Sequence, residues 1–531
     1  MTQYDMVELS FKADAPEASH VWIPMNAVIR NEKNVWQLDG FYAGNRCYKL
    51  RFLPEQSGIY YYNIQGCVEA EGSFYVGTAK PGDHGLVRTQ GTRFLFEDGT
   101  AFHPFGTTVY ALFHQDDELL AETWDTLENA PFNKLRACLF PKYYDFNHDD
   151  PPLYPFEQNP DGSWDVHRPC FAFWDRLETN ILRLSSLGIQ TDLILFHSYD
   201  RWGFSTMSIE EDCVYLDYLL RRLSAFPSVW WSLGNEYDLC KKSIAHWEQL
   251  EEYIANHDPY RHLLSCHNAL RLWDHSRPNI THVSIQSKAL WRVNAWRQQY
   301  CKPVIIDEFG YEGNFPHTWG CLSAKELVSR FWRCCTTGAY GSHGETFYDG
   351  KSEIIWWSRG GRLHGESAPR IAFLKELIES LPGHLEGIDT PPEMLYKIPQ
   401  DQRAEVYETL GVLQTLARAL WPLSEEEASF YIDSEITYQG HIEDKAFLNY
   451  YDIRCSAWDT LHLPPDKHYR VELIDTWAMT RQTVMEDVSG DVDVALPCRE
   501  YMAVLAVNCC AFLESEGRLF PANPVYIQHP V

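Results

Sequence analysis

The pattern of hydrophobic and polar positions divides the chain into stretches of different character. In residues 1–88, short runs rich in aromatic and β-branched residues are separated by proline and glycine turns. Tyr48–Phe52 alternates between polar and apolar positions, and Gly58–Ile64 and Gly72–Val76 follow at short spacing. Because such strands at regular spacing are typical of all-β modules, we expect a β-sandwich over residues 1–88.

Residues 89–385 alternate short apolar runs with helical stretches such as Phe173–Leu187 and Val214–Ala225. Eight units of this kind fit the α/β class, and a (β/α)8 TIM barrel better than an open doubly wound sheet. No GxGxxG or Walker sequence follows an apolar run, so a nucleotide-binding fold has no support. The eight candidate strands are Ala101–Thr108, Phe132–Phe140, Thr191–His197, Ser228–Asn235, Leu263–His267, His282–Gln286, Val304–Glu308 and Tyr340–Thr346.

The last third of the chain begins with a linker and returns to strand-like alternation. Residues 386–424 are predicted as a loop containing Pro391-Pro392, followed by a helix over Gln402–Leu420. Residues 425–531 are predicted as a C-terminal β-domain. Its clearest strand candidates are Tyr469–Ile474, Val492–Leu496 and Tyr501–Val507.

Composition and charge narrow the classes of partner. Aromatic residues make up 14% of the chain, which suits either β-rich cores or a groove where rings stack on sugars. The formal net charge of −29, with no basic run, argues against nucleic acid and acidic membrane surfaces. The net negative charge also disfavours an anionic polysaccharide as substrate, unless a local basic pocket outweighs the repulsion by the whole chain.

The cysteines and the amino-terminal residues indicate a compartment. The 15 cysteines are scattered and contain no CxxC pair, which suggests reduced, buried thiols. The first 16 residues lack the cationic and apolar regions of a signal peptide. No apolar run reaches the roughly 18 residues of a membrane span. We therefore expect a cytoplasmic protein without a membrane partner.

Two of the predicted barrel strands end in a glutamate. Val229–Leu233 leads into Gly234-Asn235-Glu236, and Val304–Ile306 leads into Asp307-Glu308. Active sites of TIM barrels lie at the carboxyl ends of the strands, and strands four and seven face each other across the mouth. Two opposed carboxylates are the pair that glycoside hydrolysis requires. The sequence therefore predicts a glycosidase site.

These motifs resemble those of the clan A glycoside hydrolases. Trp231–Glu236 is similar to the strand-four Asn-Glu motif of that clan, and Ile306–Gly310 to its strand-seven nucleophile motif. The resemblance implies a retaining mechanism with Glu236 as acid/base and Glu308 as nucleophile. It further implies that Asn235 binds the 2-hydroxyl of the sugar.

Residues 102–385 are similar to the apiosidase-like barrels, a clan A branch flanked by an N-terminal β-sandwich and a C-terminal β-domain. Residues 1–88 and 425–531 would fill those places. Apiosidases proper use an aspartate as acid/base, whereas this chain has Asn-Glu at strand four. The resemblance therefore does not extend to apiose as the substrate.

Further polar and aromatic residues lie in or after the strands. An arginine in strand two of the clan lies near the nucleophile, which implies this role for Arg136. The others have either a ligand-binding or a structural role, and the sequence leaves both open. The candidate substrate-binding residues are Asn235, Arg136, Lys142, Tyr143, His197, His267, Gln286, Glu345 and Trp356.

Other functions remain alternatives. His197, His267 and His343 at strand ends raise the possibility of a metallohydrolase, but neither an HxH in strand one nor an HExxH is present. We therefore expect no metal and no cofactor. A catalytically silent carbohydrate-binding barrel is the second alternative. Long loops after strands two, three and eight favour exo action on a carbohydrate substrate, and a homo-oligomer stays open.

Overall fold

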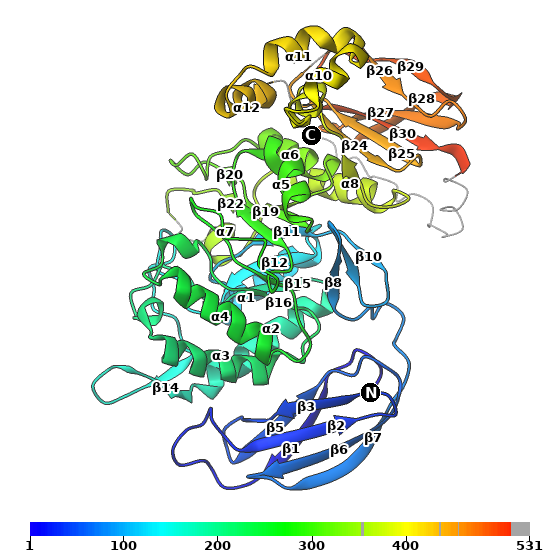
Figure 1. Cartoon of the computed structure of the whole chain (residues 1–531). Coiled ribbons are helices and arrows are strands. Elements are labelled where there is room, and N and C mark those ends of the chain that lie inside the picture. Colours follow the sequence, from blue (N-terminus) through cyan, green and yellow to red (C-terminus); the bar gives the residue numbers. More distant parts are fainter. Residues whose placement is uncertain (352–354, 435–436, 455, 511–531) are drawn as a thin grey trace, which may run out of the picture. The chain divides into compact units, whose positions relative to one another are not determined.

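The computed structural model describes residues 1–351, 355–434, 437–454 and 456–510 (Figure 1). They form two compact units, of which the first holds the N-terminal sheets and the barrel. The first unit comprises Met1–Ala289, Ala295–Leu327 and Ala339–Ile371, and the second comprises Leu290–Asn294, Val328–Gly338 and the chain from Ala372 onward. Residues 511–531, the end of the predicted C-terminal domain, lie outside the described residues.

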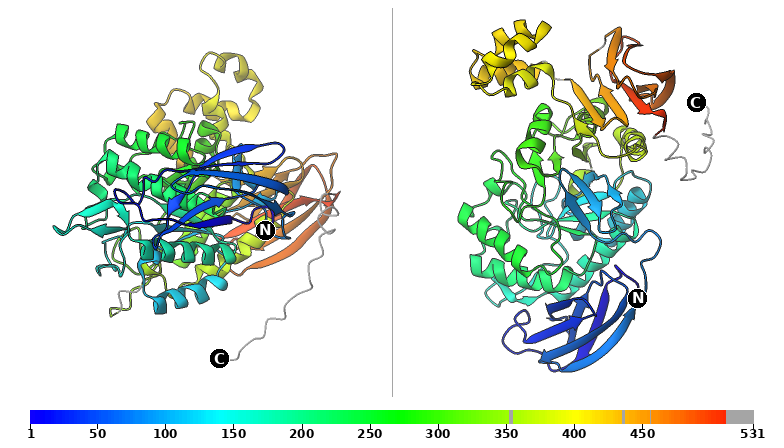
Figure 2. Two further views of the ribbon diagram at one scale, coloured as in Figure 1. Left: turned by 90° about the horizontal axis from the view of Figure 1, so that it is seen from below. Right: turned by 45° about the vertical axis from the view of Figure 1, so that its right-hand side comes forward.

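The amino-terminal strands form two antiparallel sheets that face each other (Figure 2). In β2, Met25, Ala27 and Ile29 are buried and the residues between them are exposed, because side chains alternate across a strand. Buried side chains of both sheets share one core. The strands, in sheet orders β1-β5-β4 and β3-β2-β6-β7, are β1 (Val7–Lys12), β2 (Met25–Arg30), β3 (Val35–Asp39), β4 (Phe41–Tyr42), β5 (Cys47–Phe52), β6 (Gly58–Gly66) and β7 (Ala70–Val76).

A small antiparallel sheet covers the N-terminal end of the barrel. Its residues Phe94 and Phe102 pack with Trp230, Ile305 and Tyr340, which lie at the beginning of barrel strands. Burial of these rings fills the end of the barrel opposite the predicted active site. The sheet consists of β8 (Val87–Gln90), β9 (Arg93–Phe96) and β10 (Ala101–Phe102).

The first predicted barrel strand, Ala101–Thr108, is in fact two strands. Ala101–Phe102 is β10 and pairs with β9, whereas β11 (Phe105–Thr108) is the first strand of the barrel. Pro104 lies at the break. Proline has no N–H to donate to a neighbouring strand and a fixed φ, so it interrupts the run.

The predicted (β/α)8 fold is confirmed. Eight strands form one sheet in the order β17-β16-β15-β12-β11-β21-β19-β18, and all of the paired neighbours are parallel. Both faces of these strands are buried, as is usual for parallel sheets covered by helices. Besides β11, the strands are β12 (Lys134–Cys138), β15 (Gln190–Ile194), β16 (Val229–Ser232), β17 (Leu264–Ser265), β18 (Val283–Gln286), β19 (Val304–Glu308) and β21 (Tyr340–His343).

The barrel closes between β17 and β18 through individual hydrogen bonds. The predicted strand Leu263–His267 shortens to the two residues of β17. Across the gap, the Thr281 N–H donates to the Leu264 carbonyl at 2.9 Å. Nearer the mouth, the Asn268 amide donates to the Gln286 carbonyl at 3.3 Å and accepts from the Gln286 N–H at 3.2 Å. Side chains thus replace part of the ladder at this seam.

Helices follow the barrel strands along the chain. The predicted helix Val214–Ala225 begins earlier, at Ile209 of α3, because Ser208 and Glu211 form a capping box that starts it. Two short strand pairs, β13–β14 and β20–β22, lie in the connections. These elements are α1 (Asp117–Glu128), β13 (Phe156–Gln158), β14 (Trp164–Pro169), α2 (Phe171–Ser186), α3 (Ile209–Leu223), α4 (Ile244–His257), α5 (Val293–Tyr300), β20 (Glu312–Gly313), α6 (Ala324–Thr336), β22 (Glu345–Thr346), α7 (Trp356–Arg359) and α8 (Ser367–Glu379).

The second unit carries a six-stranded antiparallel sheet, β23-β24-β25-β30-β27-β28, and the pair β26–β29. Leu461 and Val494 of the pair share a core with Val471 and Val504 of the sheet. The predicted strands correspond to β27, β29 and β30. The strands are β23 (Glu386–Gly387), β24 (Tyr438–Ile442), β25 (Ala446–Tyr450), β26 (Trp458–His462), β27 (Tyr469–Asp475), β28 (Thr480–Val488), β29 (Asp491–Ala495) and β30 (Met502–Asn508).

The helices of the second unit differ from the prediction in two places. Pro391-Pro392 begins α9 (Pro391–Lys397) rather than a loop, because proline is tolerated in the first turn and Thr390 caps the helix. The predicted single helix Gln402–Leu420 is broken into α10 (Arg403–Val406), two 3₁₀ turns and α11 (Gln414–Leu420). Gly411, at φ +54°, lies at the break. A further helix, α12, spans Glu425–Ser434.

Two properties expected from the sequence can be checked in the described residues. None of their cysteines forms a disulfide. No helix in these ranges combines the length and the apolar character that a membrane span needs.

Candidate active site

Glu236 lies directly after β16 in an unusual backbone conformation. The strand ends at Ser232, and the chain reaches Glu236 with φ 52° and ψ 52°, in the left-handed region. This region is costly for a residue with a side chain, and such strain gathers at functional sites. The residue is only 8% exposed. The turn thus holds a buried carboxylate at the carboxyl end of the strand.

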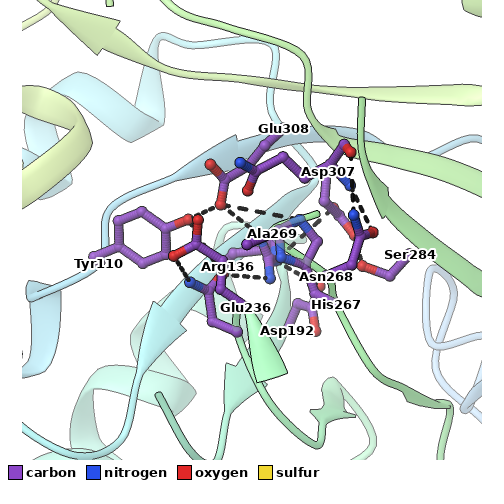
Figure 3. A network of polar contacts seen from close by, with 12 residues as sticks. Tyr110, Arg136, Asp192, Glu236, His267, Asn268, Ala269, Ser284, Asp307 and Glu308 are labelled. Carbon is purple, nitrogen blue, oxygen red and sulfur yellow. Dashed lines mark hydrogen bonds and ion pairs between the residues drawn. The ribbon is translucent and has the colours of Figure 1, made fainter. Parts of the chain in front are cut away.

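Glu308 ends β19, where the pairing register shifts. Ile285 pairs with Ile306 and Gln286 pairs with Glu308, so that Asp307 is the extra residue of a bulge. A bulge of this kind redirects side chains. Asp307 accepts hydrogen bonds from Lys134 at 2.7 Å and from Ser284 at 2.6 Å inside the barrel (Figure 3). The following carboxylate, that of Glu308, takes part in different contacts nearer the mouth.

The Glu308 carboxylate lies beside a hydroxyl, a guanidinium and an imidazole. The Tyr110 hydroxyl donates a hydrogen bond to Oε1 (Figure 3). Nη1 of Arg136 lies 3.6 Å and Nε2 of His267 lies 4.0 Å from the same oxygen. Burial lowers the pKa of His267 well below its ordinary value, so that this ring is neutral. The hydroxyl and the guanidinium together fix the orientation of this carboxylate.

The Glu236 carboxylate lies against a hydroxyl and an amide. The Tyr199 hydroxyl donates to Oε2, and the Asn235 amide donates to the same oxygen at 3.3 Å. Burial and then the charge of Glu308 raise the pKa of Glu236 to about 7, against smaller lowering effects of Tyr199 and Lys142. Glu236 is therefore able to hold a proton near neutral pH.

Asn235 and Tyr110 link the two carboxylates. Oδ1 of Asn235 accepts from the Tyr110 hydroxyl at 3.3 Å and from Nη2 of Arg136 at 3.2 Å. The same asparagine donates to Glu236, and the same tyrosine donates to Glu308. Both carboxylates therefore belong to one hydrogen-bonded network (Figure 3).

A charged layer lies beneath this network. Nζ of Lys134 is 2.6 Å from Asp192 and 2.7 Å from Asp307, and Nε of Arg136 is 3.6 Å and 3.9 Å from the same two aspartates. All four side chains are fully buried. Nearby cations hold the pKa of Asp307 far below its usual range despite its burial. The two cations and two carboxylates thus hold Arg136 beside Glu308.

Of the candidate ligand residues, five lie in or beside this network. Lys142 is buried, and its ammonium lies over the ring of Tyr110. The Gln286 side chain lowers the pKa of Glu236, which places it beside that carboxylate. The network and its immediate surroundings therefore contain Asn235, Arg136, His267, Lys142 and Gln286.

The other candidates have different contacts. Nε2 of buried His197 donates to the Phe140 carbonyl at 3.1 Å, which ties two strand-end loops together. The indole of Trp356 donates to Thr107 at 2.9 Å, so this side chain anchors its segment to the barrel. Its neighbour Trp357 instead packs against Tyr110 at 5.6 Å between ring centroids. Trp357, rather than Trp356, thus borders the carboxylate network.

Tyr143 lies at the rim. It is 37% exposed, and the guanidinium of Arg201 lies 4.6 Å from the centroid of its ring. Its backbone N–H donates to the Tyr199 carbonyl at 2.9 Å and thereby joins the loops that follow β12 and β15. None of its contacts in the described residues reaches either of the two carboxylates.

Glu345 belongs to a separate buried group. It lies with Glu312 and His343, all within 4.8 Å of one another, and these are residue types that can bind a metal. Both carboxylates, however, accept backbone N–H groups of residues 364–367. Burial raises the pKa of Glu345 to about 7. The arrangement fastens the segment before α8 and gives Glu345 no contact with the carboxylate network.

Three aromatic residues that shape the site are not among the predicted substrate-binding residues. Tyr110 lies two residues after β11, Tyr199 lies after β15, and Trp357 follows Trp356. The first two donate to the two glutamates. The rule that located Glu236 and Glu308, which considers the residues just after each strand, also leads to Tyr110 and Tyr199. No pattern in the sequence distinguishes Trp357 from Trp356.

Comparison with family models divides the chain into matched regions. The model described as the apiosidase-like catalytic domain matches residues 89–384. Two models of domains of unknown function match residues 1–66 and 435–506. No curated protein matches the chain.

Solved structures resemble the chain over most of its length. A protein from Bacteroides vulgatus ATCC 8482, whose own assignment as a glycoside hydrolase is provisional, is 32% identical with a TM-score of 0.81. The match covers 96% of this chain and 99% of that one. A glycoside hydrolase family 5 protein of the same organism is 14% identical, with a TM-score of 0.57 over 81% of this chain and 95% of that one. This second likeness concerns the fold alone.

Proposed function

This chain belongs to the apiosidase-like family of glycoside hydrolases, and on that premise we propose that it is a retaining β-glycosidase. Retention requires two carboxylates that act on one glycosidic bond from opposite faces of the sugar. Glu236 is the acid/base and Glu308 is the nucleophile. Reaction proceeds by double displacement through a covalent glycosyl-enzyme.

The contacts of Glu308 support its role as nucleophile. A nucleophilic carboxylate has to be ionised and aimed at the anomeric carbon. Arg136 and the Tyr110 hydroxyl both lie against Oε1 of Glu308, which fixes the orientation of this carboxylate. The charged layer beneath holds Arg136 in place.

The contacts of Glu236 support its role as acid/base. In the first step it protonates the leaving oxygen, and in the second it removes a proton from the attacking water. Both steps are efficient when the pKa lies near the working pH, and the pKa of Glu236 is raised to about 7. Asn235 fits the contact with the sugar 2-hydroxyl, since its amide contacts Glu236 and also Tyr110, the phenol that contacts Glu308.

We also propose exo action and a cytoplasmic location. The loops that follow β12 and β15 are tied to each other by the Tyr143–Tyr199 backbone bond and by Trp164, whose indole donates to the Trp202 carbonyl at 2.8 Å. A joined wall of this kind supports a groove that is closed at one end. A cytoplasmic enzyme would trim glycosides inside the cell.

The observation that carries the proposal is the single network that joins two glutamates in contrasting environments. It is tested with a panel of nitrophenyl glycosides and NMR detection of the first-formed anomer. We expect hydrolysis of at least one β-glycoside, with the β-anomer appearing first. An α-anomer as first product would overturn retention. Sugar binding without turnover of any natural β-glycoside would favour the silent carbohydrate-binding barrel instead.

The assignment of the two glutamates has its own test. In Glu308→Ala, azide can take the place of the missing nucleophile and attack from the same side. We expect rescue of activity with an α-glycosyl azide as product. In Glu236→Ala, azide attacks the glycosyl-enzyme and gives the β-azide. The reverse pattern would exchange the two roles.

A further inference from the structure

A buried lysine lies among four aromatic rings within the proposed site. Lys142 follows β12 and is 4% exposed. Its ammonium nitrogen lies 3.5 Å from the ring centroid of Tyr110 and 4.4 Å from that of Tyr199. It lies 4.8 Å from Trp357 and 5.3 Å from Tyr144. Cation–π contact with these rings holds the charge in one position.

This ammonium lacks an oxygen partner. Across the described residues, Lys142 donates no hydrogen bond and has no carboxylate at ion-pair distance. An ammonium group has three N–H donors, and a buried charge is costly unless it is hydrogen-bonded and paired. Aromatic faces offset part of the charge but accept none of the three donors in the way an oxygen does. The donors are therefore available to a ligand.

The position of Lys142 connects it with the reacting groups. The two nearest rings belong to Tyr110 and Tyr199, whose hydroxyls donate to Glu308 and to Glu236. A sugar held between these carboxylates lies within reach of the same aromatic walls. A hydrogen-bond acceptor on that sugar would give the N–H donors of Lys142 the partner that they lack.

The cations around the site differ in their partners. Lys134 and Arg136 face Asp192 and Asp307 in the layer below, and Arg136 also lies 3.6 Å from Glu308. Lys142 forms no ion pair with these carboxylates, although the charges of Glu236 and Glu308 act on it from a greater distance. The net charge of −29 disfavours anionic substrates only as an average over the whole chain, and a fixed, buried ammonium outweighs such a field locally.

We propose that Lys142 is a specificity-determining residue that binds a carboxylate on the glycone, so that the substrate class is β-glycosiduronic acids. This inference rests on the proposed function and names the sugar that the site accepts. A carboxylate supplies both hydrogen-bond acceptors and the opposite charge, whereas a hydroxyl supplies an acceptor alone. Arg136 is not the residue for this task, because it already contacts Asn235 and Glu308.

The test measures binding rather than turnover. It uses pairs of ligands that differ only in the group attached to C5, which is a carboxylate in one member and a hydroxymethyl group in the other. Phenyl 1-thio-β-D-glucuronide is compared with the thioglucoside, and the thiogalacturonide with the thiogalactoside, by calorimetry on the full chain. Thioglycosides resist hydrolysis, so the wild-type protein with both glutamates is measured. We expect one uronide to bind at least about tenfold more tightly than its neutral partner, a charge-assisted difference.

Variants separate the charge from the fold. Lys142→Met keeps the length and apolar stem of the side chain, and we expect it to abolish the preference for the uronide while neutral ligands keep their affinity. Lys142→Arg should keep a reduced preference. Lys33→Met, on the exposed surface of the β-sandwich, is the matched control and should behave as wild type. Near-ultraviolet circular dichroism verifies that the aromatic packing is intact.

Three results would overturn the inference. They are equal or tighter binding of the neutral partner in both pairs, no binding of either uronide, and a uronide preference that survives in Lys142→Met. Failure of the proposed function has a different signature. In that case the uronide binds through Lys142, but the matching nitrophenyl uronide is not hydrolysed.

Discussion

The two sides of the barrel mouth use the same residue type in opposite ways. After β16, a strained turn places Glu236 against a phenol and an amide in a setting that raises its pKa to about 7. At the end of β19, a bulge turns Asp307 into the charged layer and leaves Glu308 beside Arg136. The β16 side favours a carboxyl group that keeps its proton, whereas the β19 side places a guanidinium against its glutamate.

In the proposed mechanism, the surroundings of the two glutamates, rather than their residue type, separate the two roles. Two glutamates with equal surroundings would share one proton between them and could exchange functions. Here a phenol contacts each glutamate, whereas the Arg136 guanidinium and the layer of Lys134 and Asp192 lie on the Glu308 side. Pairs of titratable groups whose surroundings push their pKa values apart are typical of acid/base catalysis.

The largest expected effect comes from removing each carboxylate in turn. Glu308→Gln should lower kcat by at least about 10⁴-fold on every substrate, because no other group forms the glycosyl-enzyme. Glu236→Gln should lower the rate of glycosyl-enzyme formation by roughly 10²–10⁴-fold with a poor leaving group. With dinitrophenyl glycosides, which need no proton, this formation rate should be nearly normal. Single-turnover kinetics with both leaving groups gives the measurement.

The leaving-group dependence distinguishes the two sides. Glu210→Gln, on the exposed face of α3, is the control and should leave the rates unchanged. If Glu308→Gln responded to leaving-group acidity and Glu236→Gln did not, the two sides would have exchanged roles. If both variants kept wild-type rates on the natural substrate, neither glutamate would be catalytic.

The next effect concerns stability and lies on the β19 side. Lys134 is fully buried between Asp192 and Asp307. Lys134→Met should lower the free energy of unfolding by about 3–5 kcal/mol, because two buried carboxylates lose their partner. Denaturant unfolding followed by tryptophan fluorescence measures this loss. The double variant Lys134→Met/Asp307→Asn should recover part of it, and an unchanged loss would contradict the ion-pair explanation.

The barrel and its acid pair could be predicted from sequence because both depend on local patterns. Apolar runs and helical periodicity repeat eight times, and a glutamate after a buried run stands out. The break at Pro104 was also predictable in principle, since proline ends a strand. The closure between β17 and β18 was not, because it depends on Thr281 and Asn268 meeting partners across the seam.

Some of the contacts around the two glutamates could be predicted from the sequence, and others could not. Arg136 and Asn235 were found because a motif placed them, and the structure brings them together. Glu345 follows a strand as Glu236 does, yet it points to backbone N–H groups of residues 364–367. Which side of a strand end faces the cavity depends on register and on bulges such as that at Asp307, which a single sequence does not reveal.

A smaller effect is expected from the phenol on the β19 side. Tyr110→Phe removes the hydrogen bond to Glu308 and that to Asn235. We expect kcat to fall about 10- to 100-fold, because a hydrogen bond to a charged group contributes about 1.5–3 kcal/mol. Glycosyl-enzyme formation should slow even with dinitrophenyl leaving groups, unlike in Glu236→Gln. Single-turnover rates that stay at wild-type level would show that Tyr110 neither orients nor stabilises the nucleophile.

The smallest effect is a shift of the pH profile on the β16 side. Glu236 has to be protonated to assist departure, so kcat/KM for a poor leaving group should fall as pH rises through about 7, its raised pKa. The Tyr199 hydrogen bond lowers this pKa. Tyr199→Phe should therefore raise it and move the alkaline limb to higher pH, by about one unit. Tyr110→Phe, which removes a phenol from the other carboxylate, serves as the comparison. If the alkaline limb moved to lower pH in Tyr199→Phe, the phenol would stabilise the protonated form of Glu236. The raised pKa of Glu236 would then have a cause other than its burial.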